Sequence, residues 1–569
     1  MFDPLPEKAT ELAGWSWAEF EPYFSDLANR ELNTHSLQDF LSDWTRVSEL
    51  LDETFSRLHV ATTIDTADNE AEQRYHNFLD RIYPRAEQAE QQLKQKLLAF
   101  GVVPPGFEVP QSKMRAEAEL FRERNLPLYV EEHKLSSEYD KIIGSQTVHW
   151  DGQEMTVVQL KPVFQNADPT LREGAWRAAL RRQLEDRNAI GDLWRKFMAV
   201  RLDLSANAGF GDYRSFRWKQ MQRFDYHPSD CMRFHEAIEQ EVVPVAVRIC
   251  ERRRKLLGLE TLRPWDLEVD PMGRPPLVPF QDVSELMTGA SSVFHRIDPV
   301  LGSHFDTMIR EKLLDLDNRK NKAPGGYCTE FASAKRPFIF MNAVGVHDDV
   351  QTILHEAGHA FHAFERAHLP YYQQRQVNME FSEVASMAME FLASPYLTRA
   401  EGGFYSEADR ARAVCEHLER SILFWPYMAV VDAFQHWVYE HPSESVNPAN
   451  CDAYWATMWR RFIPWIDWSG LEDELMTGWQ RKLHIHTVPF YYVEYGLAQL
   501  GAAQVWRKAL SDQAAAVAAY RNALALGGTV ALPALYAAAG AEFSFNPAVL
   551  RAAVSLLNDK IDAAHQVAE

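Results

Sequence analysis

Residues 352–364 have the sequence Thr-Ile-Leu-His-Glu-Ala-Gly-His-Ala-Phe-His-Ala-Phe. Apolar side chains recur in this stretch every three or four positions, which is the spacing of one face of an α-helix. The stretch is therefore predicted to be an amphipathic helix. Its apolar face, which is expected to pack on a core, consists of Ile353, Ala357, Ala360, Phe361 and Phe364.

Two histidines of this helix, His355 and His359, are four residues apart, so their imidazoles lie on the same face and can bind one metal ion. Glu356 is turned by about 100° around the helix, which places its carboxylate beside a metal-bound water rather than on the metal. These are the parts of a hydrolytic zinc site. The alternative is a buried helix with two hydrogen-bonded core histidines, but the carboxylate-bearing helix that follows favours a metal.

A catalytic zinc site needs a third ligand from the protein. The metzincin pattern is excluded, because it requires Gly at position 362 and His at position 365, where this chain has His362 and Glu365. The remaining candidates share one helix face in residues 378–390, and spacing alone allows any of them to be the ligand: Glu380, Glu383 and Glu390. The other carboxylates, and His362, are expected to support the ligands by hydrogen bonding or packing.

Most of the remaining sequence has the periodicity and the end signals of helices. The fold class is therefore predicted to be mainly α. The longest helical stretches are expected at residues 69–100, 113–143 and 168–208.

Two short segments are predicted to be β-structure. Asp151-Gly152 suits the tight turn of a hairpin over residues 148–158. A further strand is predicted at Arg336–Asn342, and we expect it to lie at the edge of a sheet because Pro337 cannot donate a backbone hydrogen bond. The proline-rich residues 264–279 are expected to form a loop.

Composition and charge narrow the class of protein. The formal charge of −21 argues against binding to nucleic acid or to anionic membranes, since both need a dense surface of Lys and Arg. The five cysteines are scattered without a CxxC pair, so neither a disulfide framework nor a thiolate zinc site is expected. The first residues lack the pattern of a signal peptide, and no apolar run is long enough to span a bilayer. We therefore expect a cytoplasmic protein without a membrane partner.

Three separate motifs together resemble the oligoendopeptidase F branch of the thimet oligopeptidase family. The first is HEAGHAFH at 355–362, followed by Glu383, which lies 28 residues after His355. The others are residues 321–328 with the strand that follows them, and the tyrosine-rich residues 489–496. A weaker resemblance extends from about Asp168 to the C-terminus, which is roughly two thirds of the chain.

This resemblance implies a mainly α, two-lobed fold in which one Zn²⁺ per chain lies deep in a channel. A channel of this kind limits the substrates to short, unstructured oligopeptides. At 569 residues the chain exceeds the size of a single core, and we expect two parts: an N-terminal helical lobe over 1–165 and a catalytic domain over 166–569. The sequence does not define an oligomeric state.

By motif position, the resemblance implies Glu383 as the third metal ligand and Glu390 as a supporting carboxylate, with Glu380 and His362 also close to the ligands. The strand at 337–342 is expected to pair with extended substrate backbone. The residues implied to contact substrate are Phe338, Phe340, Asn342 and Tyr491.

During peptide hydrolysis the carbonyl oxygen of the substrate becomes negatively charged, and this oxyanion needs hydrogen-bond donors. The resemblance implies that these donors are His484, Tyr492 and Tyr495. The alternative is ordinary aromatic packing, because these tyrosines have helical spacing. The nearby His486 leaves open which histidine of the pair takes the role.

The sequence predicts a zinc-dependent endopeptidase in which Glu356 takes a proton from the attacking water and returns it to the leaving amine. An exopeptidase or dipeptidyl-carboxypeptidase of the same fold is one alternative, and it would need a charged group that captures a peptide terminus. A catalytically silent peptide-binding protein is another, although the intact Glu356 argues against it. A helical scaffold with a structural zinc is disfavoured because such sites favour four protein ligands. Mn or Co could replace zinc.

Overall fold

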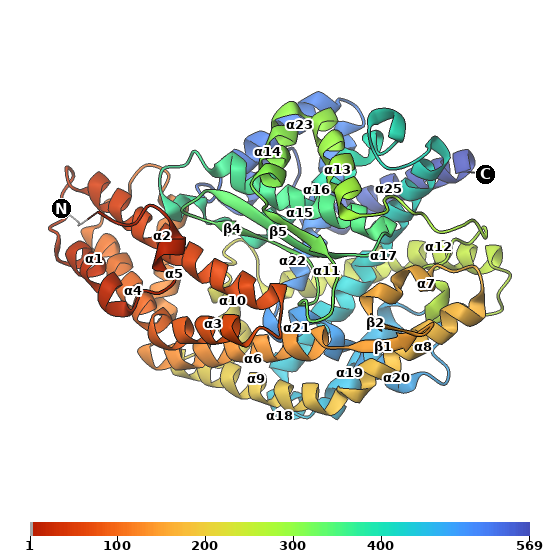
Figure 1. The fold of residues 1–569 in the computed structure, drawn as a ribbon, viewed down its shortest axis with the longest axis horizontal. Helices are drawn as coiled ribbons and strands as arrows, with labels where there is room; N and C mark the ends of the chain where they lie inside the picture. Colours follow the sequence, from red (N-terminus) through yellow and green to blue (C-terminus); the bar gives the residue numbers. More distant parts are fainter. Residues whose placement is uncertain (1–3, 569) are drawn as a thin grey trace.

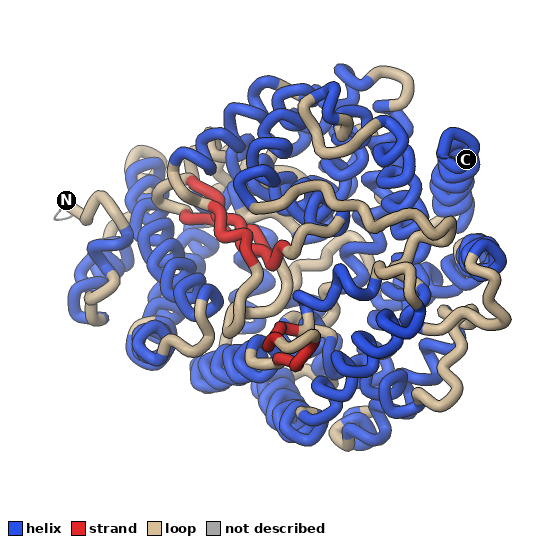
Figure 2. Tube along the Cα trace, turned by 45° about the vertical axis from the view of Figure 1, so that its right-hand side comes forward, coloured by secondary structure: helices blue, strands red, loops and turns tan. Residues whose placement is uncertain are grey.

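The computed structural model describes residues 4–568. It consists mainly of α-helices, so the predicted fold class is confirmed (Figures 1 and 2). The N-terminal helices occupy the left of Figure 1, at the opposite end of the molecule from the C-terminal helix. Six of them precede the first strand: α1 (Trp17–Asn29), α2 (Leu37–Ile64), α3 (Asn69–Arg81), α4 (Tyr83–Phe100), α5 (Glu108–Leu120) and α6 (Leu126–Gly144).

The helix predicted from residues 352–364 is α15 (His347–Arg366). The Asp349 carboxylate fixes its start by accepting hydrogen bonds from three backbone N–H groups, at 2.8, 2.8 and 3.0 Å, which belong to Val344, Gly345 and Val346. A carboxylate in the first turn also interacts favourably with the helix dipole. The predicted apolar face is buried in the core, with full burial of Ile353, Ala357, Ala360 and Phe361.

α16 (Met379–Ala393) packs directly against α15 and carries the predicted carboxylates. The helices approach at Gly358, where an added Cβ would lie 2.5 Å from the Ala385 carbonyl oxygen and 2.5 Å from Cα of Ser386. Only glycine allows so close an approach. α16 also packs against α22 (Tyr492–Ala509), and Tyr520 of α23 (Gln513–Ala525) donates to the Ala385 carbonyl at 2.7 Å.

A three-stranded sheet lies next to α15 near the centre of Figure 1. Its strands are β3 (Leu314–Asp317), β4 (Tyr327–Phe331) and β5 (Arg336–Ala343), in the order β3-β5-β4. β5 is parallel to β3 and antiparallel to β4. The strand predicted at 336–342 is therefore present, but the prediction that it lies at the edge is wrong.

Pro337 is tolerated in the central strand because of the direction in which its nitrogen points. Two residues further on, the N–H of Ile339 donates to the carbonyl of Leu313 at 2.9 Å, on the side of β3. Backbone groups alternate along a strand, so the nitrogen of Pro337 also points to that side. β3 begins only opposite Ile339, so no ladder hydrogen bond is lost at Pro337.

The three long stretches predicted to be helical are helical, and each is divided into two helices. Residues 69–100 form α3 and α4, and residues 113–143 fall in α5 and α6. Pro84 and Pro127 lie in the first turns of α4 and α6, where a missing N–H is tolerated and a new helix can begin. Residues 168–208 form α8 (Pro169–Glu185) and α9 (Arg187–Ala208), which are separated at Asp186.

The predicted hairpin is confirmed as β1 (Thr147–Trp150) and β2 (Gln153–Thr156). Asp151 and Gly152 have φ values of 49° and 76°, as a tight primed turn requires. Residues 264–279 form an irregular segment, as expected, apart from a single 3-10 turn at Pro264–Asp266.

The remaining α-helices lie between residues 161 and 568. They are α7 (Lys161–Phe164), α10 (Tyr213–Gln220), α11 (Pro228–Glu241), α12 (Val243–Leu256), α13 (Val283–Ile297), α14 (Pro299–Arg310), α17 (Glu407–Glu440), α18 (Pro442–Ser445), α19 (Pro448–Phe462), α20 (Glu472–Met476), α21 (Leu483–Thr487), α24 (Leu532–Ala539) and α25 (Pro547–Ala568). One buried apolar cluster extends from Val60 to Ile561 and another from Ala9 to Val130. The division at residue 165 stays a prediction.

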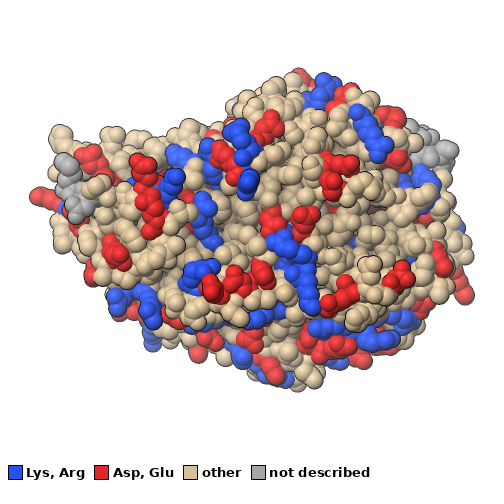
Figure 3. Space-filling model, viewed as in Figure 1, with Lys and Arg blue, Asp and Glu red and all other residues tan. Residues whose placement is uncertain are grey.

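Two observations concern the surface. Among residues 4–568, no helix is long and apolar enough to cross a membrane. On the face that Figure 3 shows, acidic and basic side chains of the described residues are interspersed, and Lys and Arg do not form a continuous area. Such a face lacks the basic footprint that phosphate backbones require.

The contact between α15 and α16 gives a first prediction. Gly358→Ala inserts a methyl group that the Ala385 and Ser386 backbones do not accommodate, so we expect a loss of about 1–3 kcal/mol in the free energy of unfolding. Urea unfolding followed by tryptophan fluorescence measures it. Gly211→Ala is the control, because its added Cβ would meet no atom within 4 Å. Equal stability of the two variants would show that the helices do not depend on this contact.

Candidate functional site

α15 and α16 bring His355, His359 and Glu383 together. Nε2 of His355 lies 3.3 Å from Oε2 of Glu383, and Nε2 of His359 lies 3.4 Å from the same oxygen. Ligand atoms of all three residues lie within 4.8 Å of one another. Among the three candidate carboxylates, Glu383 is the one that the fold places against both histidines.

The other two candidate carboxylates have different partners. Oε1 of Glu390 lies 2.7 Å from Nδ1 of His355, so it fixes the tautomer that leaves Nε2 free to bind a metal. Glu380 accepts a hydrogen bond from the Tyr226 hydroxyl at 2.7 Å and lies 3.8 Å from Nε of Arg223. Glu390 therefore supports a ligand histidine, whereas Glu380 belongs to a neighbouring polar network.

The ionisation of these groups follows from burial and contact. Burial opposes the charged form of Glu383, but its contacts with His359 and His355 lower its pKa well below the ordinary value. Burial also opposes the charge on His355, but hydrogen bonds to Glu383 and Glu390 raise its pKa well above the ordinary value. The buried His362, one turn beyond His359, has its pKa lowered by burial, and its Nε2 has no hydrogen-bond partner among the described residues.

The residues present fit one Zn²⁺. Two imidazole nitrogens and one carboxylate oxygen, facing a cavity, are the donor set of a catalytic zinc site. Next to them, Oε2 of Glu356 is buried and has no hydrogen-bond partner among the described residues. A buried carboxylate oxygen without a partner is costly unless a ligand or water satisfies it.

Glu356 faces residues that precede β5 in the chain. A Cβ added at Gly326 would lie 3.3 Å from Oε1 of Glu356, so glycine at this position keeps space beside the carboxylate. Burial raises the pKa of Glu356 above the ordinary value of a glutamate. Burial, together with the negative charge of Glu356, also raises the pKa of the Cys328 thiol. Both groups adjoin the metal ligands in the cavity wall.

His484 of α21 and two tyrosines at the start of α22 also face this site. Nε2 of His484 lies 3.1 Å from the Tyr495 hydroxyl, and the Tyr491 hydroxyl donates to Oε1 of Glu383. Burial lowers the pKa of His484 to about 3 and raises the pKa of Tyr495. Both side chains are therefore neutral near pH 7 and can act as hydrogen-bond donors.

A strained residue turns the chain between α21 and α22. Phe490 has a φ of 66°, a left-handed conformation that costs about 1–3 kcal/mol for a residue of this type. It is held by Gln435, whose Oε1 accepts from the Phe490 N–H at 2.7 Å, and by Arg223, which donates to the Phe490 carbonyl at 2.5 Å. This turn brings His484 and Tyr495 to the same place.

Tyr492 and His486 do not lie in this cavity. Tyr492 packs against Phe424 and Tyr427, with ring centroids 5.7 and 5.8 Å away, and Nζ of Lys482 lies 4.2 Å from its ring. The position of Tyr492 fits ordinary aromatic packing better than hydrogen bonding to an oxyanion. His486 is fully buried and stacks on Tyr139 and Trp479, so His484 is the histidine that reaches the site.

His355, His359 and Glu383 line a cavity of about 640 Å³. One wall is the edge strand β4, and the opposite part comes from α21 and α22. Side chains of the N-terminal helices α2 and α6 also line it, namely His59, Thr63, His133, Ser136 and Asp140. No motif in the sequence marks these five residues, because long-range packing alone brings them to the site.

The predicted substrate-binding residues of β5 lie behind β4. Phe338, Phe340 and Asn342 are not among the residues that line the cavity. Phe340 is buried and stacks on Tyr327 with ring centroids 4.7 Å apart. Asn342 donates to the carbonyls of Ala323 and Gly325 at 2.9 and 2.8 Å. It therefore holds the loop that leads into β4.

Comparison with known proteins identifies the family. Residues 163–555, more than half of the chain, match the family model of peptidase family M3. The chain belongs to peptidase family M3. Oligopeptidase PepF of Bacillus subtilis (strain 168) is 23% identical over 329 residues, which cover 56% of this chain and 47% of that protein. The match thus spans about half the length of this M3 relative.

Solved structures match this M3 chain over almost its whole length. PZ peptidase A with inhibitor 2 is 26% identical with a TM-score of 0.89, covering 99% of this chain and 98% of that chain. A structure named as an oligoendopeptidase F is 26% identical with a TM-score of 0.91, covering 97% and 98%. Another of that name, from Bacillus anthracis str. Ames, shares the fold at 23% identity, with a TM-score of 0.86 and 97% of both chains covered. The predicted membership of the oligoendopeptidase F branch is confirmed.

The placement of His486 predicts a pH dependence of stability. Burial lowers its pKa to about 3 in the folded protein, whereas an unfolded histidine titrates near 6.5. Below pH 6.5 the unfolded chain therefore binds a proton that the folded chain excludes, and stability is lost as the pH falls. Between pH 7.5 and pH 5 this residue should lower the free energy of unfolding by about 2 kcal/mol.

His486→Phe removes this group and keeps a ring for the stack. Urea unfolding at pH 7.5 and at pH 5 should show a difference between the two pH values that is about 2 kcal/mol smaller than in the wild type. His35→Phe, at an exposed position, controls for loss of an imidazole. If His486→Phe and wild type lose the same stability on acidification, His486 is not a buried neutral group.

Proposed function

We propose that this M3 protein is a zinc-dependent endopeptidase that hydrolyses internal bonds of short, unstructured oligopeptides. The observation that carries the proposal is the convergence of His355, His359 and Glu383 beside the buried, unpartnered Glu356. These four residues come from two adjoining helices and face one cavity.

His355, His359 and Glu383 would hold one Zn²⁺ per chain. When bound, this ion polarises the peptide carbonyl and makes water more acidic. Glu390 keeps the His355 ring in place through its hydrogen bond to Nδ1. The Tyr491 hydroxyl does the same for the Glu383 carboxylate.

Glu356 acts as the base. Its carboxylate accepts the proton of the water that attacks the scissile carbonyl, and it then delivers this proton to the leaving amine. Burial raises its pKa, which makes it a stronger base than an exposed carboxylate and so favours the first of these proton transfers. The unpartnered Oε2 leaves one oxygen available for the water.

His484 and Tyr495 donate to the oxyanion. Their 3.1 Å contact places an imidazole and a phenol side by side in the cavity wall, and burial keeps both neutral. Neutral donors positioned where negative charge develops contribute several kcal/mol to transition-state stabilisation, about 3–4 kcal/mol for a single donor. Tyr492, which packs outside the cavity, is left out of this role.

The edge strand β4 would bind the substrate backbone. Because Ile339 directs its N–H to β3, the residue opposite it, Cys328, directs its backbone groups away from β5, and so does Glu330 two residues on. Both residues line the cavity, so an extended peptide can add to β4 as a further strand. Backbone pairing of this kind gives affinity with little side-chain selectivity.

The cavity favours endopeptidase action over the exopeptidase or dipeptidyl-carboxypeptidase alternative. A terminal carboxylate would need a free cation, and Arg366 is the one Lys or Arg among the described residues that line the cavity. It is already bound to the Glu330 carboxylate at 2.5 Å and to the Arg375 carbonyl. The silent peptide-binding alternative is disfavoured by the intact Glu356.

Glu356→Gln tests both the activity and the role of the base. With an internally quenched peptide blocked at both termini, wild type should cleave an internal bond, and the variant should lose at least about 100-fold in kcat while keeping about one zinc per chain. Glu108→Gln, at an exposed position of α5, is the control and should cleave like wild type. Zinc is quantified by mass spectrometry in all three proteins.

The other outcomes separate the alternatives. If wild type binds zinc but cleaves only peptides with a free terminus, the protein is an exopeptidase. If it binds zinc and cleaves neither blocked nor unblocked peptides, the peptide-binding alternative is correct. Full activity of Glu356→Gln would remove this residue from the mechanism.

Backbone pairing with β4 predicts a sensitivity to N-methylation of the substrate. Methylating one amide beside the scissile bond removes a donor and blocks the strand on that side, so KM should rise about 5- to 10-fold at the positions that pair with Cys328 or Glu330. Steady-state kinetics with a series of singly N-methylated peptides measures this. Uniform KM values along the series would contradict strand addition.

A further inference from the structure

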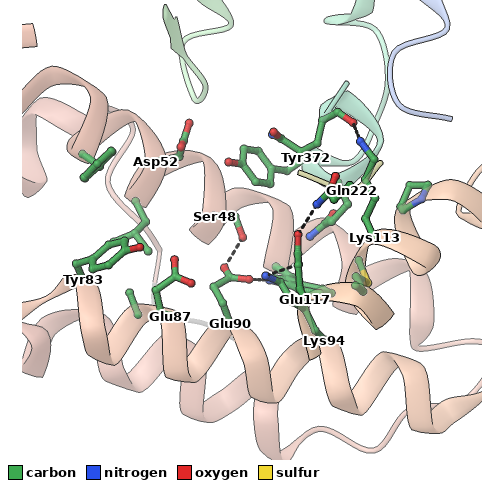
Figure 4. Close-up of a pocket in the computed structure, with 18 of the residues that line it drawn as sticks. Ser48, Asp52, Tyr83, Glu87, Glu90, Lys94, Lys113, Glu117, Gln222 and Tyr372 are labelled. Atoms are coloured by element: carbon green, nitrogen blue, oxygen red, sulfur yellow. Dashed lines mark hydrogen bonds and ion pairs between the residues drawn. The ribbon is translucent and has the colours of Figure 1, made fainter. Parts of the chain in front are cut away.

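A second cavity, of about 440 Å³, lies among the N-terminal helices (Figure 4). Its walls come from α2, α4 and α5 and from the short helical turn Tyr372–Arg375. His133, Gln376 and Val377 line both cavities, so the two cavities are adjacent. The three helices lie outside the region that matches the M3 family model.

This second cavity has an excess of acidic side chains. Four carboxylates line it, together with two lysines: Asp52, Glu87, Glu90, Glu117, Lys94 and Lys113. Lys94 pairs with Glu117 at 2.8 Å, and Lys113 donates to the backbone carbonyl of Gln376 at 2.7 Å. Lys94 also interacts electrostatically with Glu87 and Glu90, so three carboxylates share this one ammonium group.

Two acceptors in the wall have no hydrogen-bond partner. Glu87 interacts electrostatically with Lys94 but makes no direct hydrogen bond or ion pair with a described residue, and Figure 4 shows its carboxylate at the cavity between Tyr83 and Glu90. Gln373 is nine-tenths buried, and its amide oxygen Oε1 has no partner among the described residues. A carboxylate and an amide oxygen both accept hydrogen bonds, so they call for a donor, and the excess of carboxylates in the wall favours a donor that carries positive charge.

The other walls suit an alkyl-linked cation. Aromatic rings of Trp44, Phe55, Phe78 and Tyr83 line the cavity, and their faces attract ammonium and guanidinium groups. Burial raises the pKa of Glu87 and of Glu90, and burial with the Glu330 charge raises the pKa of Asp52 to about 7. A cation in the cavity would reverse these shifts, because it stabilises the ionised carboxylates.

We propose that this cavity binds a cationic group of the peptide substrate, either a Lys or Arg side chain or the N-terminal ammonium, while another part of the peptide lies at His355 and His359. The inference rests on the proposed peptidase function and assigns a specificity pocket to it. Glu87 is the principal acceptor, and Gln373 is the neutral one. In this proposal the N-terminal helices determine which substrates bind, and residues of α15 and α16 carry out the hydrolysis.

Matched peptides test this proposal. In a blocked, internally quenched peptide, Arg is placed at each position in turn and compared with citrulline, which has the same shape without the charge. At one position, wild type should show kcat/KM at least about ten-fold higher for Arg than for citrulline. In Glu87→Gln this ratio should fall toward one, and in Glu87→Lys it should fall below one. Glu108→Gln, which lies outside the cavity, should keep the wild-type ratio.

A second experiment compares cleavage of an otherwise neutral peptide with an acetylated N-terminus and with a free N-terminus. A preference for the free amine that Glu87→Gln abolishes assigns the cavity to the N-terminal ammonium, and a preference for Arg alone assigns it to a side chain. The absence of any charge preference in wild type, or a preference that Glu87→Gln retains, overturns the proposal.

A binding measurement separates this result from failure of the proposed function. Calorimetric titration of the Glu356→Gln protein with the Arg and citrulline peptides reports the charge preference without turnover. If no peptide is cleaved but Arg is bound more tightly in a Glu87-dependent way, the pocket stands and the peptidase proposal fails. If peptides are cleaved without a charge preference, the peptidase proposal stands and the pocket is overturned.

Discussion

The close contact between α15 and α16 at Gly358 determines the rest of the site. The backbones of two neighbouring helices can come this close only where no side chain lies between them. Gly358 has no side chain, so α15 can contact the backbone of Ala385 and Ser386 directly. Glu383 lies just before this point of contact, so its carboxylate reaches His355 and His359 on the facing helix. A wider separation of the helices would move the Glu383 carboxylate away from the two histidines.

Placing so many ionisable groups in a buried region requires partners for each charge. The Arg223 guanidinium serves two carboxylates: it lies 2.8 Å from Glu494 and 3.8 Å from Glu380. It also holds the strained backbone at Phe490, which positions His484 and Tyr495. Removing one member of such a network leaves a buried charge unpaired, which is far more costly than loss of an exposed ion pair. The polar network around Arg223 is therefore in direct contact with the turn that positions residues of the candidate site.

The parts that sequence could predict are those set by local spacing. HEAGH specifies the helix, its apolar face and the two histidines, and Asp-Gly specifies the hairpin, because the interacting residues are close in the chain. The edge position of β5 could not be predicted from Pro337, since the direction of its nitrogen depends on where β3 begins. Tyr492 and Tyr495 have equivalent spacing, and only the packing of α22 decides which one faces the cavity. The N-terminal residues in the cavity walls carry no motif at all.

The central claim is that the fold selects Glu383, rather than Glu380 or Glu390, as the partner of the two histidines. The most direct test is a crystal structure of the zinc-loaded protein with anomalous data collected at the zinc edge. We expect one peak per chain, bonded to Nε2 of His355, Nε2 of His359 and a carboxylate oxygen of Glu383. Zinc bound to Glu380 or Glu390, or no zinc at the two histidines, would contradict this claim.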